Sequence, residues 1–165
     1  MWRILAILSG VGGAVALSQF PEFSQQYLQR LAGKVDALTA IAVQFDATGA
    51  KNALTREAAL AAMTGSPILT DQQADMRATL AMQARLAENL ATLRAATPLA
   101  RLTMPQRLGD VETLQATYAD FKPAVPATTE GAITAGIGYV GGWSLVWLLG
   151  GLVSWPFSRR RRSLG

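Results

Sequence analysis

The sequence has no cysteine and no histidine among its 165 residues. Without Cys, a disulfide framework and thiolate chemistry are excluded. Without His, the commonest general base and the commonest metal ligand of proteins are missing. We therefore expect a protein that is not an enzyme, with no catalytic, cofactor-binding or metal site, no cofactor and no evident small-molecule substrate.

Aromatic residues make up only 7% of the chain, and Val and Ile are sparse outside its two ends. Alternating apolar and polar residues, which are typical of a half-buried strand, never persist. Ala and Leu are abundant instead, and both lose little side-chain entropy in a helix. The composition therefore predicts an all-α protein.

The net charge of +4 is unevenly distributed along the chain. All 11 acidic residues lie between Glu22 and Glu130, together with 10 of the 15 basic residues, so that this stretch has a net charge of −1. The other basic residues flank the apolar ends, as is typical of the cytoplasmic side of membrane spans. No aromatic reading surface accompanies them, so we do not expect nucleic acid as a partner.

The C-terminal apolar segment is the stronger membrane signal. From Gly131 to Phe157 the chain has 27 residues without a charge, and about 20 apolar residues cross a bilayer as a helix. Trp155 comes four residues before the arginine run, where an interfacial aromatic ring is expected. We predict a transmembrane helix over residues 128–157 and a basic cytoplasmic tail over residues 158–165.

The N-terminal apolar segment is shorter. It reaches from Ile4 to Phe20, which is the short limit for a span. A signal peptide is the alternative, because the start is basic and residues 14–16 form a cleavage-like triplet. We favour a retained transmembrane helix over residues 1–20, and both interpretations place Glu22 onward outside the cytoplasm.

The orientation follows from the basic residues, which the positive-inside rule assigns to the cytoplasm. We expect two spans in the inner (cell) membrane of a bacterium, both termini in the cytoplasm, and residues 21–127 in the periplasm. Anionic lipids are expected at the arginine tail, with a cytoplasmic partner as the alternative. The predicted membrane-interface anchors are Arg3, Trp155, Arg159, Arg160, Arg161 and Arg162.

Both apolar ends carry small residues at four-residue spacing, which lets helix backbones approach closely in lipid. The contact could join the two spans or involve another subunit. Glycine is also frequent in membrane helices generally, so the pattern does not identify the partner helix. The predicted helix–helix packing residues are Ser9, Gly12, Gly13, Ala16, Ala132, Gly136, Gly138 and Gly142.

The polar middle region is expected to form an antiparallel helical hairpin that resembles a coiled coil. Apolar residues recur after Pro21 at spacings of three and four, and Gly49 is a plausible helix end. A shorter Ala-rich helix is expected over residues 50–63. Thr70 and Gln73 then form a capping-box pattern for a second long helix that ends near residue 96. The predicted hairpin seam consists of Leu28, Leu31, Val35, Leu38, Phe45, Met76, Leu80 and Leu90.

A last amphipathic helix is expected over residues 110–121. Its apolar face would hold Val111, Leu114, Tyr118 and Phe121. Two carboxylate pairs, at residues 71 and 75 and at residues 110 and 112, could in principle bind a metal or transfer protons. Acidic residues are common in the first turn of a helix for electrostatic reasons alone, so we do not assign them a catalytic role.

The run Gln-Phe-Pro-Glu-Phe at residues 19–23 directly follows the first apolar helix, and Gln26 and Tyr27 come soon after. This stretch resembles a family of uncharacterised proteobacterial membrane proteins, the domain of unknown function 2937. Tyr118 and the proline break at residues 123–126 are placed similarly to that family, and the layout of two terminal spans around a helical middle is similar too. The resemblance implies a bacterial inner membrane and no particular activity.

Our leading hypothesis is a non-catalytic structural or accessory subunit of an inner-membrane complex, with a respiratory or photosynthetic complex as one host. Its partners would be other integral membrane subunits. The alternative is a homo-oligomeric periplasmic scaffold or sensor whose partner is the same chain. A membrane-bound enzyme is a third and weaker hypothesis.

Overall fold

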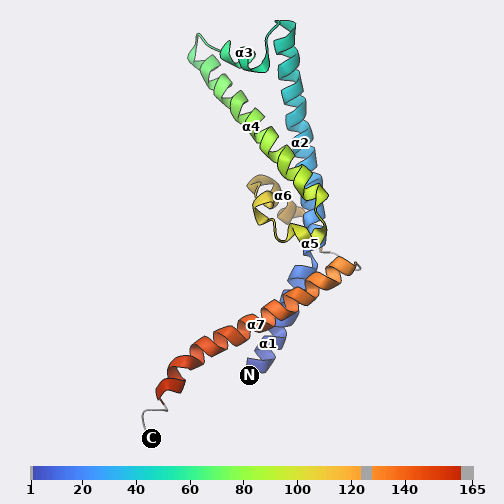
Figure 1. Cartoon of the computed structure of the whole chain (residues 1–165), viewed down its shortest axis with the longest axis vertical. Coiled ribbons are helices and arrows are strands. Elements are labelled where there is room, and N and C mark those ends of the chain that lie inside the picture. The colour runs from blue at the N-terminus through green and yellow to red at the C-terminus, as the bar shows by residue number, and fades with distance from the viewer. Residues whose placement is uncertain (1, 124–127, 161–165) are drawn as a thin grey trace. The chain divides into compact units, whose positions relative to one another are not determined.

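The computed structural model describes residues 2–123 and 128–160, and it describes the side chains of these as far as residue 152 (Figure 1). No strand is present in this part of the chain, so the all-α prediction is confirmed. The elements are α1 (Trp2–Ser18), α2 (Phe20–Lys51), α3 (Arg56–Ala61), α4 (Pro67–Ala95), α5 (Pro98–Arg101), the 3₁₀ helix η1 (Pro105–Leu108), α6 (Val111–Asp120) and α7 (Thr129–Arg160).

The chain forms two compact units. The first, which we call the end unit, contains both ends of the chain, Met1–Ser24 and Phe121–Gly165. The second, the middle unit, is Gln25–Asp120. This division brings the two apolar segments together and separates them from the polar region.

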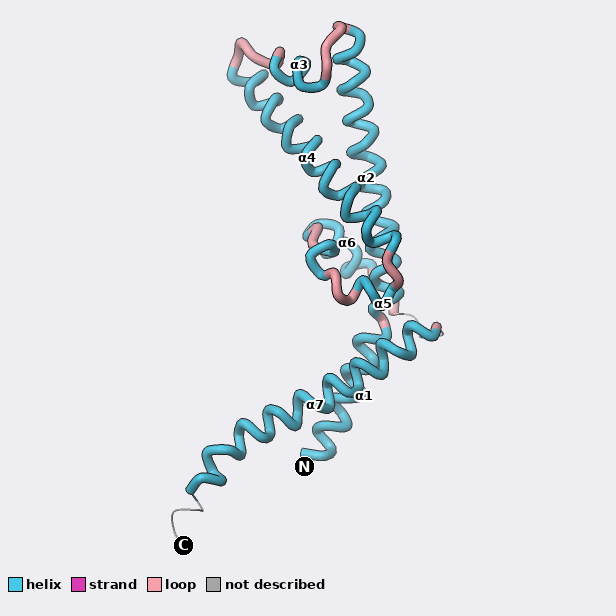
Figure 2. Tube along the Cα trace, viewed as in Figure 1, coloured by secondary structure: helices cyan, strands magenta, loops and turns pink. Residues whose placement is uncertain are grey.

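In the end unit, α1 and α7 run antiparallel and make the most extensive helix–helix contact of the described chain (Figure 2). Thr128 caps α7, because its hydroxyl oxygen accepts a hydrogen bond from the Gly131 amide at 3.1 Å. Two helical stretches are long and apolar enough to cross a membrane. One begins at Trp2, and the other is Thr129–Leu152.

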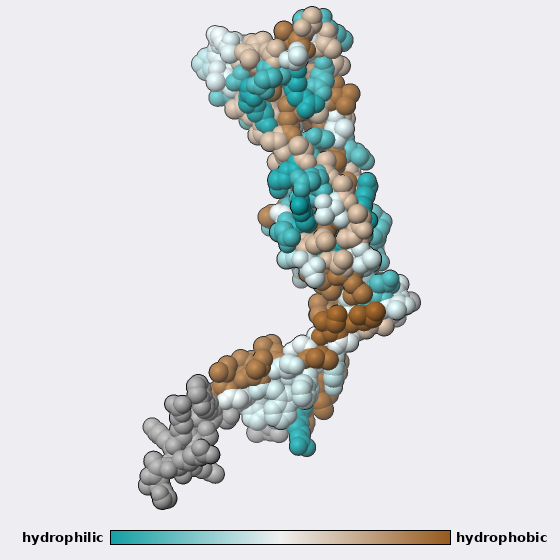
Figure 3. All heavy atoms as spheres, viewed as in Figure 1, coloured by the Kyte–Doolittle hydropathy of each residue, from teal (hydrophilic) through white to brown (hydrophobic). Residues whose placement is uncertain are grey.

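Large apolar side chains of both helices point outward, for example Leu8 and Leu148. A core helix of a soluble protein would bury such residues, so the end unit has the character of a membrane protein. In Figure 3, hydrophilic side chains gather over the middle unit and are few on the visible face of the end unit.

In the middle unit, α2 and α4 run in opposite directions, converge near α5 and diverge toward α3 (Figure 1). The core lies where they converge, because the large buried side chains are concentrated there. Its members are Tyr27, Leu28, Leu31, Val35, Leu86, Leu90, Leu93 and Leu108.

The predicted hairpin seam is therefore only partly buried. Leu28, Leu31, Val35 and Leu90 belong to the core, whereas Leu38, Phe45, Met76 and Leu80 are half-buried because the two helices separate there. The predicted seam is thus most deeply buried at the end where α2 and α4 converge.

The helix α3 fills the space between the separated ends through two adjacent residues of opposite charge. Arg56 pairs with Asp46 of α2 at 2.5 Å. Glu57 pairs with Arg77 of α4 at 2.5 Å. The helix α3, of six residues, thus makes one exposed ion pair to each of the two longer helices.

Several predicted helix boundaries are also wrong. The helix α2 continues past Gly49 to Lys51, and the left-handed residue in the following turn is Ala53, with φ of 55°. The Ala-rich helix is shorter than predicted, because Thr55 caps it at Arg56.

The capping box predicted at Thr70 and Gln73 is not formed. Ser66 caps α4 instead, and Pro67 occupies its first turn, where a missing amide hydrogen costs nothing. The Gln73 amide nitrogen donates to the Leu60 carbonyl oxygen at 2.6 Å and so ties α4 to α3.

Candidate functional site: the membrane helix pair and the outward face of α6

The closest approach between α1 and α7 is made by two glycines. A Cβ atom on Gly13 would overlap the backbone carbonyl of Gly138, and a Cβ on Gly138 would overlap the carbonyl of Gly13. Only residues without a side chain allow this contact, which maximises dispersion between the helices in lipid, where the hydrophobic effect gives no drive. The two backbones therefore touch directly.

One helical turn away, a hydrogen bond joins the same two helices. The Ser9 hydroxyl donates to the Gly142 carbonyl oxygen at 2.9 Å, and a Cβ on Gly142 would overlap the Ser9 carbonyl. Interhelical hydrogen bonds of this kind contribute about 0.6 kcal/mol or more within a membrane. Close backbone packing and an interhelical hydrogen bond thus both hold α1 against α7.

Four of the eight predicted packing residues form this contact, and the other four do not. A Cβ atom on Gly12 or Gly136 would meet no heavy atom of another part of the chain within 4 Å, and Ala16 and Ala132 are exposed. The reason is helical phase, because residues three or four apart share one face of a helix and neighbouring residues lie on another. These four residues therefore do not form the contact between α1 and α7, and their packing against another subunit stays a prediction.

Sequence reasoning missed Gly10. A Cβ there would lie 2.9 Å from the Tyr139 ring, and Ala6 on the same face is fully buried. The signal was available, because Ala6, Gly10 and Gly13 lie at spacings of four and three, and form a continuous small-residue face.

The predicted interface anchors are placed only in part. Arg3 is exposed in the first turn of α1. Trp155, Arg159 and Arg160 belong to α7, but their side chains lie outside the described residues, as do Arg161 and Arg162 entirely.

In the middle unit, α6 is held against α2 by a buried polar cluster. Asp110 caps α6, because its carboxylate accepts hydrogen bonds from the Thr113 amide at 3.2 Å and the Thr113 hydroxyl at 2.5 Å. Lys34 of α2 donates to Asp110 at 2.9 Å and to Glu112 at 2.8 Å. The Asp110 amide donates to the Tyr27 hydroxyl oxygen at 3.3 Å. Every partner is on another element or at the start of α6, so the cluster sets the orientation of this helix.

The electrostatics of this cluster favour a structural role. Burial alone would raise the pKa of Asp110, but hydrogen bonds from Thr113 and Lys34 outweigh it and lower that pKa. Burial alone would lower the pKa of Lys34, but its bonds to Glu112 and Asp110 raise it. Both groups therefore stay charged near neutral pH, whereas a proton-transfer catalyst needs a pKa near the working pH.

The predicted apolar face of α6 is the exposed one. Val111 and Tyr118 are 62% and 78% exposed, and Leu114 also reaches the surface, whereas Thr113 and Thr117 are buried. The buried threonines are satisfied locally, since the Thr117 hydroxyl donates to the Thr113 carbonyl at 2.7 Å. Phe121, the fourth predicted member of this face, is half-buried and its ring meets that of Phe23, with 5.6 Å between the ring centroids. The polar cluster therefore determines which side of α6 faces the core.

Neither predicted carboxylate pair forms a metal site. Asp71 and Asp75 are exposed, and Asp110 and Glu112 share the Lys34 ammonium. Across residues 2–123 and 128–160 the structure holds no group of three or more acidic residues, histidines or cysteines placed to bind a metal ion.

Residues 1–159 match the family described as "Protein of unknown function (DUF2937)". The chain belongs to this family. No curated protein and no solved structure matches it. The DUF2937 match covers α1, the middle unit and nearly all of α7, so the glycine contact and the α6 cluster both lie inside it.

Proposed function

We propose that this DUF2937 chain is a non-catalytic structural or accessory subunit of a protein complex in the bacterial inner membrane, with a respiratory or photosynthetic complex as one host. In this proposal α1 and α7 are the two spans, both termini are cytoplasmic, and the middle unit is periplasmic. The observation that carries the proposal is the outward apolar face of α6, formed by Val111, Leu114 and Tyr118.

The orientation of α6 supports the proposal, because an apolar face exposed to water is energetically unfavourable. An apolar stripe on a helix normally turns toward the core, and here a buried ion pair holds it toward the solvent. Exposed apolar patches mark interaction sites more often than isolated apolar residues do. A Tyr ring at the end of the stripe adds the residue type that is enriched at protein interfaces.

The membrane helix pair supports the same function. The direct contact of Gly13 with Gly138 gives the chain a closed two-helix anchor, while outward-pointing residues such as Trp143 and Trp147 are left for lipid or neighbouring helices. The close packing also supports retention of α1, since a signal peptide would be removed.

The deciding experiment is purification of the full chain in a mild detergent, followed by mass spectrometry of what accompanies it. We expect stoichiometric foreign membrane subunits. Recovery of this chain alone, at a defined multiple, would contradict the proposal and favour a homo-oligomeric scaffold or sensor.

A variant of α6 tests whether its apolar face binds the co-purifying subunits. The double substitution Leu114→Ser and Tyr118→Ser should reduce the recovered partner subunits several-fold. The matched control is Ile68→Ser, which removes a similarly exposed apolar residue from α4. Equal loss in the control and the α6 variant would show that α6 is not the docking face.

A further inference from the structure

Arg3 is the only charged side chain of α1, the shorter of the two apolar helices. The contact between α1 and α7 determines its level along α7. Ser9 is opposite Gly142, because the two share a hydrogen bond. The helices run antiparallel with the same rise per residue, so Arg3, six residues before Ser9, lies level with Leu148.

The helix α7 continues well past this level. Trp2 still contacts it, since a Cβ atom on Gly150 would lie 3.3 Å from the Trp2 ring, but α7 extends for ten more residues. The next charge along it is Arg159, eleven residues beyond Leu148 and thus about 16 Å further along the helix axis. Arg3 is therefore level with exposed apolar side chains of α7, namely Leu148, Leu149 and Leu152.

The end unit offers Arg3 no acidic side chain as a counter-charge. Its two acidic residues are Glu22 and Glu130. Glu130 is 18 residues from Leu148 on the same helix, which is about 27 Å, and Glu22 follows Arg3 by 19 residues. Among the residues that the structure describes, none makes a hydrogen bond or an ion pair with the Arg3 side chain.

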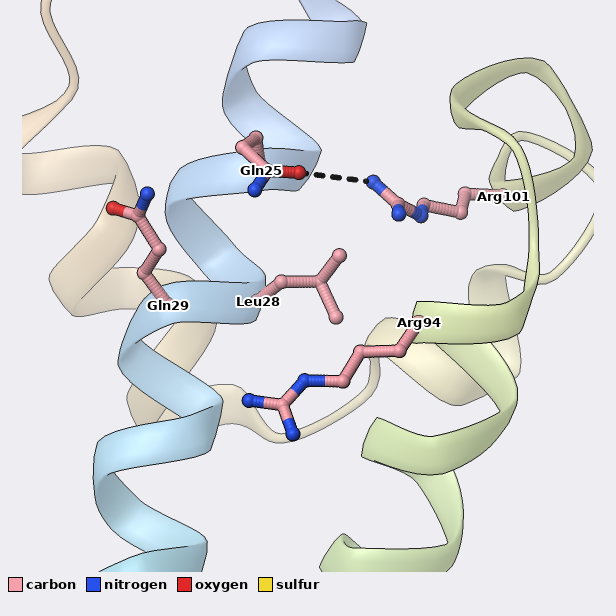
Figure 4. A pocket seen from close by; sticks show the side chains of 5 residues that line it. All are labelled: Gln25, Leu28, Gln29, Arg94 and Arg101. Carbon is pink, nitrogen blue, oxygen red and sulfur yellow. Dashed lines mark hydrogen bonds between the residues drawn. The ribbon is translucent and has the colours of Figure 1, made fainter.

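The middle unit shows how this chain treats a guanidinium that is removed from water. Arg101 is only 7% exposed. Its Nε donates to the Leu93 carbonyl oxygen at 2.9 Å, and its Nη1 donates to the Gln25 side-chain oxygen at 3.5 Å (Figure 4). A charged group needs such partners wherever water is excluded. In a bilayer Arg3 would be removed from water too, and its partners would have to come from outside the chain.

We propose that Arg3 binds the phosphate group of an anionic phospholipid, held deeper in the bilayer than the surrounding headgroups. This inference rests on the proposed function, in which α1 and α7 cross the membrane with their basic ends in the cytoplasm. A guanidinium presents a planar fork of donors that matches phosphate oxygens. Local thinning of the bilayer and water defects lower the cost of a charged side chain at this depth. A carboxylate on a partner helix would itself be costly there.

The first measurement reports the depth of the headgroups. The full chain has no natural Cys, so Leu148→Cys carries a single nitroxide label in phosphatidylglycerol vesicles. A water-soluble nickel complex should reach this label, and its access should fall several-fold after Arg3→Gln, because headgroups and water are no longer drawn to this level. The matched control is Arg85→Gln, at an exposed position of the middle unit, which should change nothing. Equal access with and without Arg3 would overturn the proposal.

The second measurement identifies the ligand. The full chain, in an uncharged detergent, is titrated calorimetrically with a short-chain phosphatidylglycerol and separately with inorganic phosphate. Arg3→Gln should weaken lipid binding several-fold, and Arg85→Gln should bind like the unchanged chain. The arginine run at the other end of the chain is the same in all three proteins, so the difference isolates Arg3. Equal lipid binding by the two variants, or equally strong binding of inorganic phosphate, would overturn the proposal.

Failure of the proposed function would give a different result. If no foreign subunit co-purifies, the accessory role is contradicted, while the two measurements on Arg3 still stand. If Arg3→Gln instead loses the co-purified subunits and keeps its lipid binding, a carboxylate of a partner meets Arg3. That outcome would overturn the lipid proposal alone.

Discussion

At the residue scale, glycine has two different roles in α1 and α7 that depend only on where each one faces. Gly13, Gly138 and Gly142 lie where a side chain would overlap the backbone of the other helix. Gly12 and Gly136 face open space. The same residue type is thus essential for packing at one position and replaceable one or two positions away.

Gly138→Leu should separate α1 from α7, because the new side chain overlaps backbone that cannot move aside, at a cost of about 1–3 kcal/mol. Gly136→Leu is the control and should change little. Since the natural chain has no Cys, Ile7→Cys and Leu145→Cys at two exposed positions provide the only spin-label sites. A longer or broader label distance is expected for Gly138→Leu only, and an unchanged distance would refute the glycine contact.

Ala53 is the one described residue other than glycine with a positive φ, at 55°. Ala53→Gly should raise the free energy of unfolding by about 1 kcal/mol, because Gly adopts this region without a Cβ clash. Ala40→Gly, at an exposed position in the interior of α2, should lower it by about 1 kcal/mol. Thermal unfolding of the full chain in detergent, followed by circular dichroism, measures both, and a decrease for both would contradict the assignment of the turn.

At the scale of the element, α6 and α3 depend on charged groups more than on apolar burial. The buried Asp110 carboxylate and Lys34 decide which face of α6 points inward. The adjacent residues Arg56 and Glu57 of α3 reach opposite helices. Both elements should therefore respond to pH or salt while the apolar core does not.

The attachment of α6 should weaken in acid. The pKa of Asp110 is lower in the folded chain than in the unfolded one, so its stabilisation is full above the unfolded value of about 4 and is lost as pH falls through the folded value. Hydrogen exchange of α6 amides, corrected for the intrinsic effect of pH, should show this loss. Asp110→Asn should lower the free energy of opening of α6 by about 2 kcal/mol at neutral pH and should remove its acid dependence. Asp71→Asn is the control and should change neither.

Exchanging the charges of α3 should release the separated ends of α2 and α4. In the double variant Arg56→Glu and Glu57→Arg, like charges face Asp46 and Arg77, and the net charge of the chain is unchanged. Spin labels at Thr48→Cys and Asp71→Cys, on exposed positions of α2 and α4, should report a broader distance. The unexchanged chain should move toward the same distribution at high salt, because salt screens exposed pairs.

At the scale of the whole molecule, the end unit joins residues from opposite ends of the chain. Ser9 and Gly142 are 133 residues apart in sequence and share a hydrogen bond. The middle unit lies in the sequence between the two paired helices, α1 and α7. In the proposed topology, both of its connections would therefore leave the membrane on the same side. This arrangement makes the orientation of the middle unit a single testable property.

A reporter enzyme that is active only in the periplasm, fused after Gly65, should be active. The basic flanks of the two apolar segments predict this orientation. The control is the same reporter fused at the C-terminus, which should be inactive. Activity of the C-terminal fusion with an inactive Gly65 fusion would reverse the assigned topology.

The sequence by itself determined the elements with strong periodicity or long apolar runs. Two apolar helices and an all-α middle were readable because helix length and composition are local properties. Half of the small-residue set, Ser9, Gly13, Gly138 and Gly142, was readable for the same reason. The sequence did not decide which face of each helix makes the contact, because small residues occur on more than one face of each helix. The resemblance to the DUF2937 family came instead from the Gln-Phe-Pro-Glu-Phe run at residues 19–23.

Only the tertiary structure decided which faces are buried. The apolar stripe of α6 points outward because Asp110, at the start of this helix, is bound by Lys34 and Tyr27 of α2, which are distant in sequence. The seam between α2 and α4 stops where α3 enters, through ion pairs that no local pattern reveals. The glycines first identified by spacing alone became a contact with a defined partner, because pairing of the two ends depends on the fold of the whole chain.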